Sequence, residues 1–258
     1  MSAIWAKELF YRDYTTEYGM GRLEPNKPSD NPILWLAQML YRFKKAEIID
    51  KRDTDNAFFA LENCVVIKDG QKIRGLHWRS PDSQLLEAHD NLVAIAAISV
   101  LIESVHAREM CDRGNKYGWS FHSKDPEKQE IRTTLQGGTI CFIKLCAGYN
   151  PYPIEFIWML LGILNAGVKK YTYKWFKGNV ASTVNINWLV IDALDEVYKK
   201  KFTTTHWTYL PYQIVRILFK SLVNSQGGIY HYYRNYFKPE HPIHLFEKVL
   251  DGERYYAK

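Results

Sequence analysis

The second half of this chain is a succession of apolar segments of helix length, each bounded by Gly, Pro, Asn or Thr. They are TLQGGTICFIKLCAG, IEFIWMLLGILNAG, STVNINWLVIDALDEVYKKK, PYQIVRILFKSLVNS and HPIHLFEKVL. Apolar runs of this length favour helices, and the Gly and Pro at their borders end them. The run over 154–164 is apolar on nearly all sides, which is typical of a helix buried within a larger protein.

The first half adds two helical patterns. Residues 32–46 carry apolar side chains at spacings of three and four, preceded by Asn31 as N-cap and begun by Pro32 at the first helical position. Residues 53–67, DTDNAFFALENCVVI, predict a shorter helix that stops at the turn KDGQ. Both patterns belong to the helical class.

Two further helix starts are predicted between residues 80 and 91. Ser80 as N-cap before Pro81 opens a short helical turn, and Asp90 is predicted to cap a long helix that continues to about Cys111. Residues 112–130 then form a loop of a length that is usually functional or disordered.

No convincing series of alternating strands accompanies these helices. We therefore predict an all-α protein with eight to nine helices arranged as α/α-hairpins, either toroid-like or as a bundle. Neither a fixed-period repeat nor a shift in composition divides the sequence. Residues 1–258 are expected to form a single domain.

The positive charge lies in the last third of the chain. The formal net charge is +6, and residues 169–258 hold 14 Lys and Arg against 7 Asp and Glu. The densest run, Lys199 to Lys201, matches a helix C-terminus, where cations complement the helix dipole. Because no basic stripe with interleaved aromatic residues accompanies the run, nucleic-acid binding is disfavoured.

The sequence also disfavours disulfides and membrane insertion. The four cysteines show no CxxC pair and fit small buried residues in a reducing compartment: Cys64, Cys111, Cys141 and Cys146. The longest apolar stretches, 92–102 and 154–168, are shorter than the roughly 20 residues that span a bilayer. With no secretory signal visible, we expect synthesis in a cytoplasm.

Three blocks resemble a known group of proteins. SPDSQLLEAHDNLVAI, LQGGTICFIKLCAG and YYRNYFKPEHPIHLF are similar to blocks of poorly characterised all-helical proteins encoded by tailed bacteriophages, in which SPD…SHDN and KLCAG strings recur. The Ser-Pro-Asp turn that opens an inner helix also resembles that of bacterial α/α-toroid proteins, a fold shared with many glycan-active enzymes. Where those proteins have SHDN, this chain has AHDN at residues 88–91, so the match to the first string is inexact. The resemblance implies an all-helical fold and a phage context. It does not assign a catalytic role to any residue.

The first candidate site is a polar cluster that lies around the predicted helix starts at Ser80 and Asp90. Its members are His77, Trp78, Asp82, Glu87, His89 and Asp90. Carboxylates at a shared mouth could act as general acid and base while Trp78 stacks on a sugar. Alternatively, Asp82 in a first turn and Asp90 as an N-cap bind backbone N–H groups, and capping explains both. Capping does not require the other four residues, which remain candidates.

Two aromatic loops form the second candidate. They contain Tyr117, Trp119, Phe121, His122, Tyr149, Asn150 and Tyr152. This composition fits a carbohydrate groove or a protein contact surface, and it fits rings packed over the edge of the core equally well.

Other site types are disfavoured. His241 and His244 are three residues apart, but Pro242 breaks the helical register between them, and we expect no metal and no cofactor. The sequence contains no GxGxxG or GxxxxGK[ST] phosphate loop and no GxSxG elbow. Nucleotide chemistry and serine hydrolysis are therefore disfavoured.

The hypothesis that fits best is a phage-encoded structural or accessory protein, made in the host cytoplasm and associated with the virion, that acts through protein contacts. Its partners would be other virion proteins or further copies of itself. The alternative is a glycan-active enzyme on an α/α-toroid, with Asp82, Glu87 or Asp90 as acid and base.

Overall fold

The computed structural model describes residues 3–25, 27–29, 31–79, 81, 89–119, 134–168, 180–234 and 236–250. It is 67% helical and 6% strand, with eleven helices and one two-stranded sheet among these residues. The all-α prediction is confirmed. The predicted number of helices, eight to nine, is too low.

The elements follow one another as helices α1 (Ala3–Asp13), α2 (Pro32–Lys45) and α3 (Lys51–Cys64), strands β1 (Val65–Lys68) and β2 (Gln71–His77), and helices α4 (Asp90–Leu101), α5 (His106–Tyr117), α6 (Thr134–Ala147), α7 (Pro153–Gly167), α9 (Val180–Lys200), α10 (Tyr209–Ser225), α11 (Gly228–Arg234) and α12 (Pro242–Leu250). All five apolar segments of the second half are helices, as predicted. The sequence reading missed α1 and α11.

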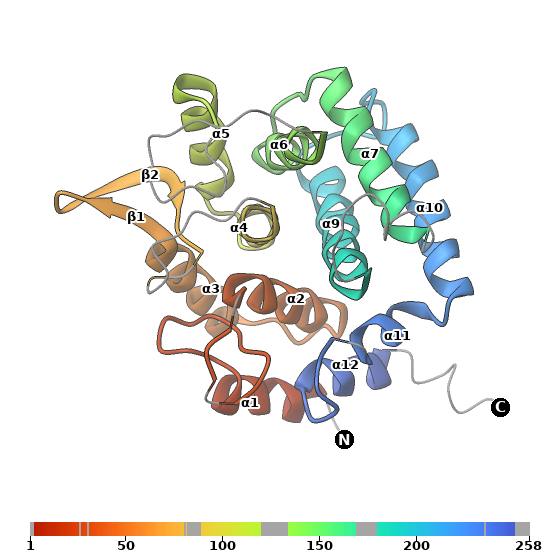
Figure 1. Cartoon of the computed structure of the whole chain (residues 1–258). Helices are drawn as coiled ribbons and strands as arrows, with labels where there is room; N and C mark the ends of the chain where they lie inside the picture. The colour runs from red at the N-terminus through yellow and green to blue at the C-terminus, as the bar shows by residue number, and fades with distance from the viewer. Residues whose placement is uncertain are drawn as a thin grey trace.

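Helix α4 lies at the centre of the molecule, with α2, α5, α6 and α9 packed around it (Figure 1). Every residue of α4 from Asn91 to Leu101 is buried. Such burial is expected of a helix that is apolar on all sides. This packing of helices around a central helix fits the predicted all-α class.

The hairpin β1–β2 replaces the end of a predicted helix. Helix α3 stops at Cys64, and the β-branched run after it pairs with β2 in antiparallel register. The two residues that connect the strands, Asp69 and Gly70, have φ angles of 51° and 76°. Positive φ at both positions is the signature of the tight turn that favours hairpins, for which Asp-Gly is a preferred sequence. The prediction of a helix through residue 67 is therefore wrong at its C-terminal end.

Gly75 allows β2 to pack directly against α5. Its φ angle is 77°, and a Cβ atom at this position would lie 2.2 Å from the carbonyl oxygen of Glu109. We expect Gly75→Ala to lower the free energy of unfolding by about 3 kcal/mol, from left-handed strain plus a backbone clash. Gly70→Ala is the control, since Gly70 has the same φ and no atom within 4 Å; strain alone should cost about 1 kcal/mol. If urea denaturation showed the same loss of unfolding free energy for Gly75→Ala and Gly70→Ala, the predicted clash with Glu109 would be contradicted.

A break separates α4 from α5, where one long helix to about residue 111 was predicted. Glu103 has a φ angle of 57°, which no α-helix accommodates. The hydroxyl of Ser99 accepts a hydrogen bond from the backbone N–H of Ala107 at 3.1 Å and so fixes the start of the second helix. The long-helix prediction is wrong because a left-handed residue can turn the chain without Gly or Pro.

Candidate functional site

His77, the first residue of the predicted polar cluster, is buried at the end of β2. It is 3% exposed, and its ring centroid lies 5.7 Å from that of His106 in α5. The Nε2 atom of His106 is 3.1 Å from Glu62 of α3. Burial, aided by His106, lowers the pKa of His77 to about 3, and neither ring nitrogen has a hydrogen-bond partner among the described residues. His77 is therefore a neutral residue between three elements and is closed to solvent.

Trp78 belongs to the packing of the hairpin. Its backbone N–H donates to the carbonyl of Cys64 at 2.7 Å. Its partly buried ring packs with Ile73 against a small core formed by Val66 and Leu76. These contacts account for an aromatic residue at this position without a bound sugar.

Of the three carboxylates proposed as acid and base, only Asp90 can be placed, because Asp82 and Glu87 lie outside the described residues. Asp90 is the first residue of α4, and the N-cap position belongs to His89, whose side chain makes no cap bond. The prediction that Asp90 is the cap is wrong by one residue, although its carboxylate still complements the helix dipole. Nδ1 of His89 lies 3.3 Å from the hydroxyl of Thr139 in α6.

The first aromatic loop is partly core. Trp119 is buried against Gly114 of α5, where a Cβ atom would lie 2.3 Å from the indole ring. Tyr117 is half exposed, with the guanidinium of Arg113 5.2 Å from its ring centroid. His122 lies outside the described residues. Trp119 is therefore a ring packed at the edge of the core, the second of the two predicted alternatives. It is too buried to form part of an exposed contact surface.

The second aromatic loop is held by ionic groups. The hydroxyl of Tyr149 donates to Asp112 at 2.8 Å. Tyr152 is exposed before α7, with Nζ of Lys144 4.2 Å from its ring centroid. The same ammonium donates to Glu155 at 2.7 Å, and this carboxylate accepts the backbone N–H of Tyr152 at 3.1 Å. These contacts fix the start of α7.

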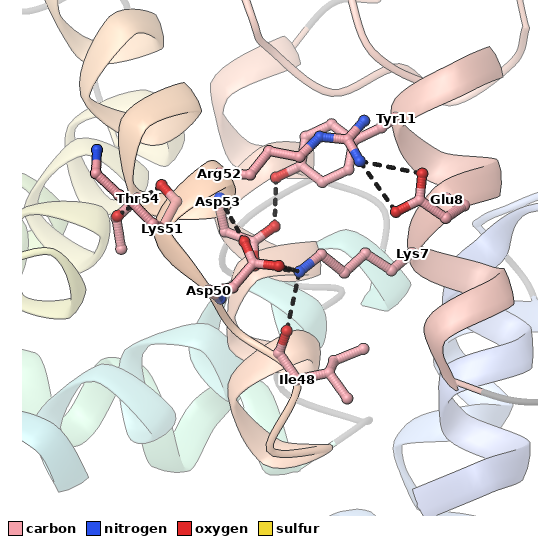
Figure 2. Close-up of polar contacts among 9 residues, drawn as sticks. All are labelled: Lys7, Glu8, Tyr11, Ile48, Asp50, Lys51, Arg52, Asp53 and Thr54. Carbon is pink, nitrogen blue, oxygen red and sulfur yellow. Dashed lines mark hydrogen bonds and ion pairs between the residues drawn. The ribbon is translucent and has the colours of Figure 1, made fainter.

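A buried ionic cluster joins α1 to the start of α3 (Figure 2). Nζ of Lys7 donates to Asp53 at 2.6 Å, to Asp50 at 2.7 Å and to the carbonyl of Ile48 at 2.9 Å. The hydroxyl of Tyr11 donates to Asp53 at 2.7 Å, and burial together with this carboxylate raises the tyrosine pKa. Because all three ammonium donors of Lys7 are used, the cluster holds the two helices together and offers no reactive group.

A second ionic cluster joins α2, α9 and α11. Asp192 of α9 lies 2.8 Å from Nζ of Lys45 and 3.3 Å from the guanidinium of Arg42, which also donates to the hydroxyl of Tyr233. Burial alone would raise the pKa of Asp192, but the charges of Lys45 and Arg42 hold it below its ordinary value. This cluster is also structural, since its charges are paired with one another.

The histidines near the C-terminus bind backbone groups. Nε2 of His241 lies 3.0 Å from the carbonyl oxygen of Arg22, and Nε2 of His244 lies 3.1 Å from that of Phe237. Among the described residues, no three His, Cys, Asp or Glu side chains are arranged to hold a metal ion. The four cysteines are buried as free thiols, in agreement with their predicted role in packing.

The largest unexplained feature is an apolar surface on α7 and α10. It consists of side chains that are each about half exposed or more: Ile154, Ile157, Leu161, Leu210, Ile214, Ile217 and Leu218. We call this set the α7/α10 face. On each helix the exposed residues recur at spacings of three and four, opposite the buried residues. The prediction that the segment 154–164 is buried on all sides is therefore wrong for its outer face.

The two helices of this face pack along their whole length at one side of the molecule (Figure 1). At their N-terminal ends, the ring centroids of Phe156 and Trp207 are 5.2 Å apart. At their C-terminal ends, a Cβ atom on Gly167 would lie 3.2 Å from Leu222. Helices α7 and α10 therefore run in the same direction, and their exposed stripes lie next to each other.

The helices of the α7/α10 face carry no unpaired charge. The charged residues of α7 and α10 are Glu155, Arg216 and Lys220. Glu155 is buried with Lys144, while Arg216 and Lys220 lie 2.7 Å and 3.6 Å from Asp195 of α9. All three charges are thus paired within the protein, although the side chains of Arg216 and Lys220 remain 31% and 29% exposed.

No protein-family model matches the chain, and comparisons with curated proteins and with solved structures found no significant match. No helix among the described residues is both long and apolar enough to cross a membrane.

Proposed function

We propose that the protein is a structural or accessory protein that acts through contacts with other proteins, and that the α7/α10 face is a contact surface. Helices of 15 and 17 residues are about 22 and 25 Å long. Packed at a usual separation, they present roughly 500 Å² of surface on one side. The largest apolar patch of a typical monomeric protein is about 300–600 Å² and is often functional, so this patch is a candidate contact surface. This patch is the observation that carries the proposal.

The phage context comes from the resemblance of the sequence blocks, and we propose the virion as the setting. Glycan chemistry is not part of the proposal. Of its candidate carboxylates only Asp90 lies among the described residues, while the candidates His77 and Trp78 pack inside or against the protein.

The proposal predicts that the chain is incorporated into phage particles. Mass spectrometry of purified phage particles should detect the wild-type chain, and Ile217→Glu should reduce its amount strongly, because a buried carboxylate opposes an apolar contact. Ile67→Glu is the matched control, since Ile67 is 59% exposed on the hairpin and Ile217 is 61% exposed on α10. Both substitutions should leave folding intact. Particles without the chain, or equal losses for both variants, would contradict the proposal.

A further inference from the structure

We infer that the α7/α10 face binds the same face of a second copy of this chain, so that two copies form a dimer with two-fold symmetry. The inference rests on the proposed function and names one partner. A two-fold contact uses the same surface on both copies, so the surface must be complementary to itself.

Charge is the first argument for a second copy. Two copies each carry a formal charge of +6, and a two-fold contact brings like charges close together near its axis. The α7/α10 face limits this repulsion, because Arg216 and Lys220, the partly exposed charged residues of its helices, are paired with Asp195. By contrast, the exposed Phe58 and Phe59 of α3 share their helix with Lys51 and Arg52, whose paired side chains are far more exposed, at 86% and 53%. Phe58 and Phe59 would meet these charges in a two-fold contact.

The size of the surface is the second argument. Apposition of two such faces would remove roughly 1,000 Å² from water, the lower limit for a specific interface. Exposed Tyr152 and Trp207 flank the N-terminal ends of the two helices and would add to this area. Aromatic side chains are enriched in the cores of protein interfaces, and charged residues are depleted there. The composition of the face and its borders follows both rules.

The pairing of the basic residues also argues against a lipid surface as the occupant. Helices that lie on membranes carry Lys and Arg on their polar side, where they attract anionic lipids. On α10, both basic residues are bound to Asp195. A protein surface of the same apolar kind is the better match.

The oligomeric state tests the inference directly. Sedimentation of the full chain over a wide concentration range should show a monomer–dimer equilibrium. Ile217→Glu should weaken dimerisation by about 30-fold or more, as expected for a central interface residue that occurs twice in the contact. Ile67→Glu should leave the equilibrium unchanged. Circular dichroism of both variants should match the wild-type spectrum.

Cysteine crosslinking adds a test of symmetry. The four native cysteines are buried, so Leu161→Cys introduces an exposed thiol near the centre of the face. Oxidation should link two copies through this residue, whereas Ile67→Cys should not form the linked dimer. Failure of Leu161→Cys to crosslink, together with a dimer that survives Ile217→Glu, would overturn the inference.

Failure of the inference can be distinguished from failure of the proposed function. A wild-type chain that stays monomeric at all concentrations overturns the second copy as the partner. If Ile217→Glu still removes that monomeric chain from particles, the proposed function stands with a different protein on the face. Binding of the monomer to phosphatidylcholine vesicles, lost in Ile217→Glu, would identify a lipid occupant and overturn the inference.

Discussion

Replacement of Lys7 by Met is expected to lower the free energy of unfolding by about 3–5 kcal/mol, because it leaves a buried carboxylate without its counter-ion. Asp53 is completely buried and accepts hydrogen bonds from Lys7 and Tyr11 (Figure 2). Methionine keeps most of the length of the lysine side chain, so the substitution removes mainly the charge and its donors. The loss should appear as a lower midpoint in urea denaturation with an unchanged slope.

Lys51→Met is the matched control for this prediction. The Lys51 side chain is 86% exposed, and its pair with Asp55 at 2.6 Å is a surface contact one helical turn long. Such pairs contribute about 0.5 kcal/mol or less. The double variant Lys7→Met/Asp53→Asn should lose less stability than Lys7→Met alone, because it removes the buried charge as well. If Lys7→Met cost no more than Lys51→Met, the cluster would not hold α1 to α3.

The parts of the fold that follow local rules could be predicted from the sequence. Helix α2 begins at Pro32 and ends at Lys45, close to the predicted 32–46, because its apolar spacing and its first residue both signal a helix. The β1–β2 hairpin could also have been predicted from local sequence rules. Asp69-Gly70 between two β-branched or mixed runs is a hairpin signal, but the apolar run before it also fitted a helix.

The position of an apolar helix in the molecule could not be predicted. Helices α4 and α7 are both apolar on nearly all sides, and the sequence alone predicts burial for both. Helix α4 is covered by four other helices, whereas α7 packs against α6, α9 and α10 and leaves its outer face exposed. Which helix becomes central depends on contacts between distant segments. The exposed side of α7 therefore follows from the tertiary fold and not from the sequence pattern. It forms part of the main candidate site, the α7/α10 face.

The surroundings of the polar residues at 77–90 could not be predicted either, because they also depend on contacts with distant segments. These residues are close in sequence, which suggested a common site, yet His77 packs against His106 and His89 lies beside Thr139. The Lys7–Asp53 contact joins residues 46 positions apart and carried no local signal. Burial and pairing of polar side chains depend on such long-range contacts, which spacing alone does not specify.

Stability is expected to fall as the pH drops from about 6.5 toward 3, because two buried histidines stay neutral in the folded protein and bind protons when it unfolds. Burial is the main cause that lowers the pKa of His77 and His241 from 6.5 to about 3. Between these values the unfolded state binds more protons, so acid favours unfolding. At pH 4.5 each histidine should reduce the free energy of unfolding by about 2.7 kcal/mol relative to neutral pH.

His77→Phe isolates one of these contributions. Because neither ring nitrogen of His77 has a hydrogen-bond partner in the part of the chain that the structure describes, the substitution removes a proton site without breaking a hydrogen bond seen there. Denaturation at several pH values should show that the variant loses about 2.7 kcal/mol less than wild type between pH 7 and 4.5. His241→Phe should show the same change in pH slope from a lower neutral stability, since it loses its contact with Arg22.

The paired carboxylate Asp192 acts in a different pH window. Its folded pKa lies below the ordinary value of 3.8, so its contribution to stability is present above that value and is lost as the pH falls through the folded pKa. The range between 6.5 and 4.5 therefore reports the histidines, and His106, whose pKa burial also lowers, contributes beside His77 and His241. Equal pH slopes for wild type and His77→Phe in that range would mean that His77 takes up its proton in the folded protein, which burial without a hydrogen-bond partner argues against.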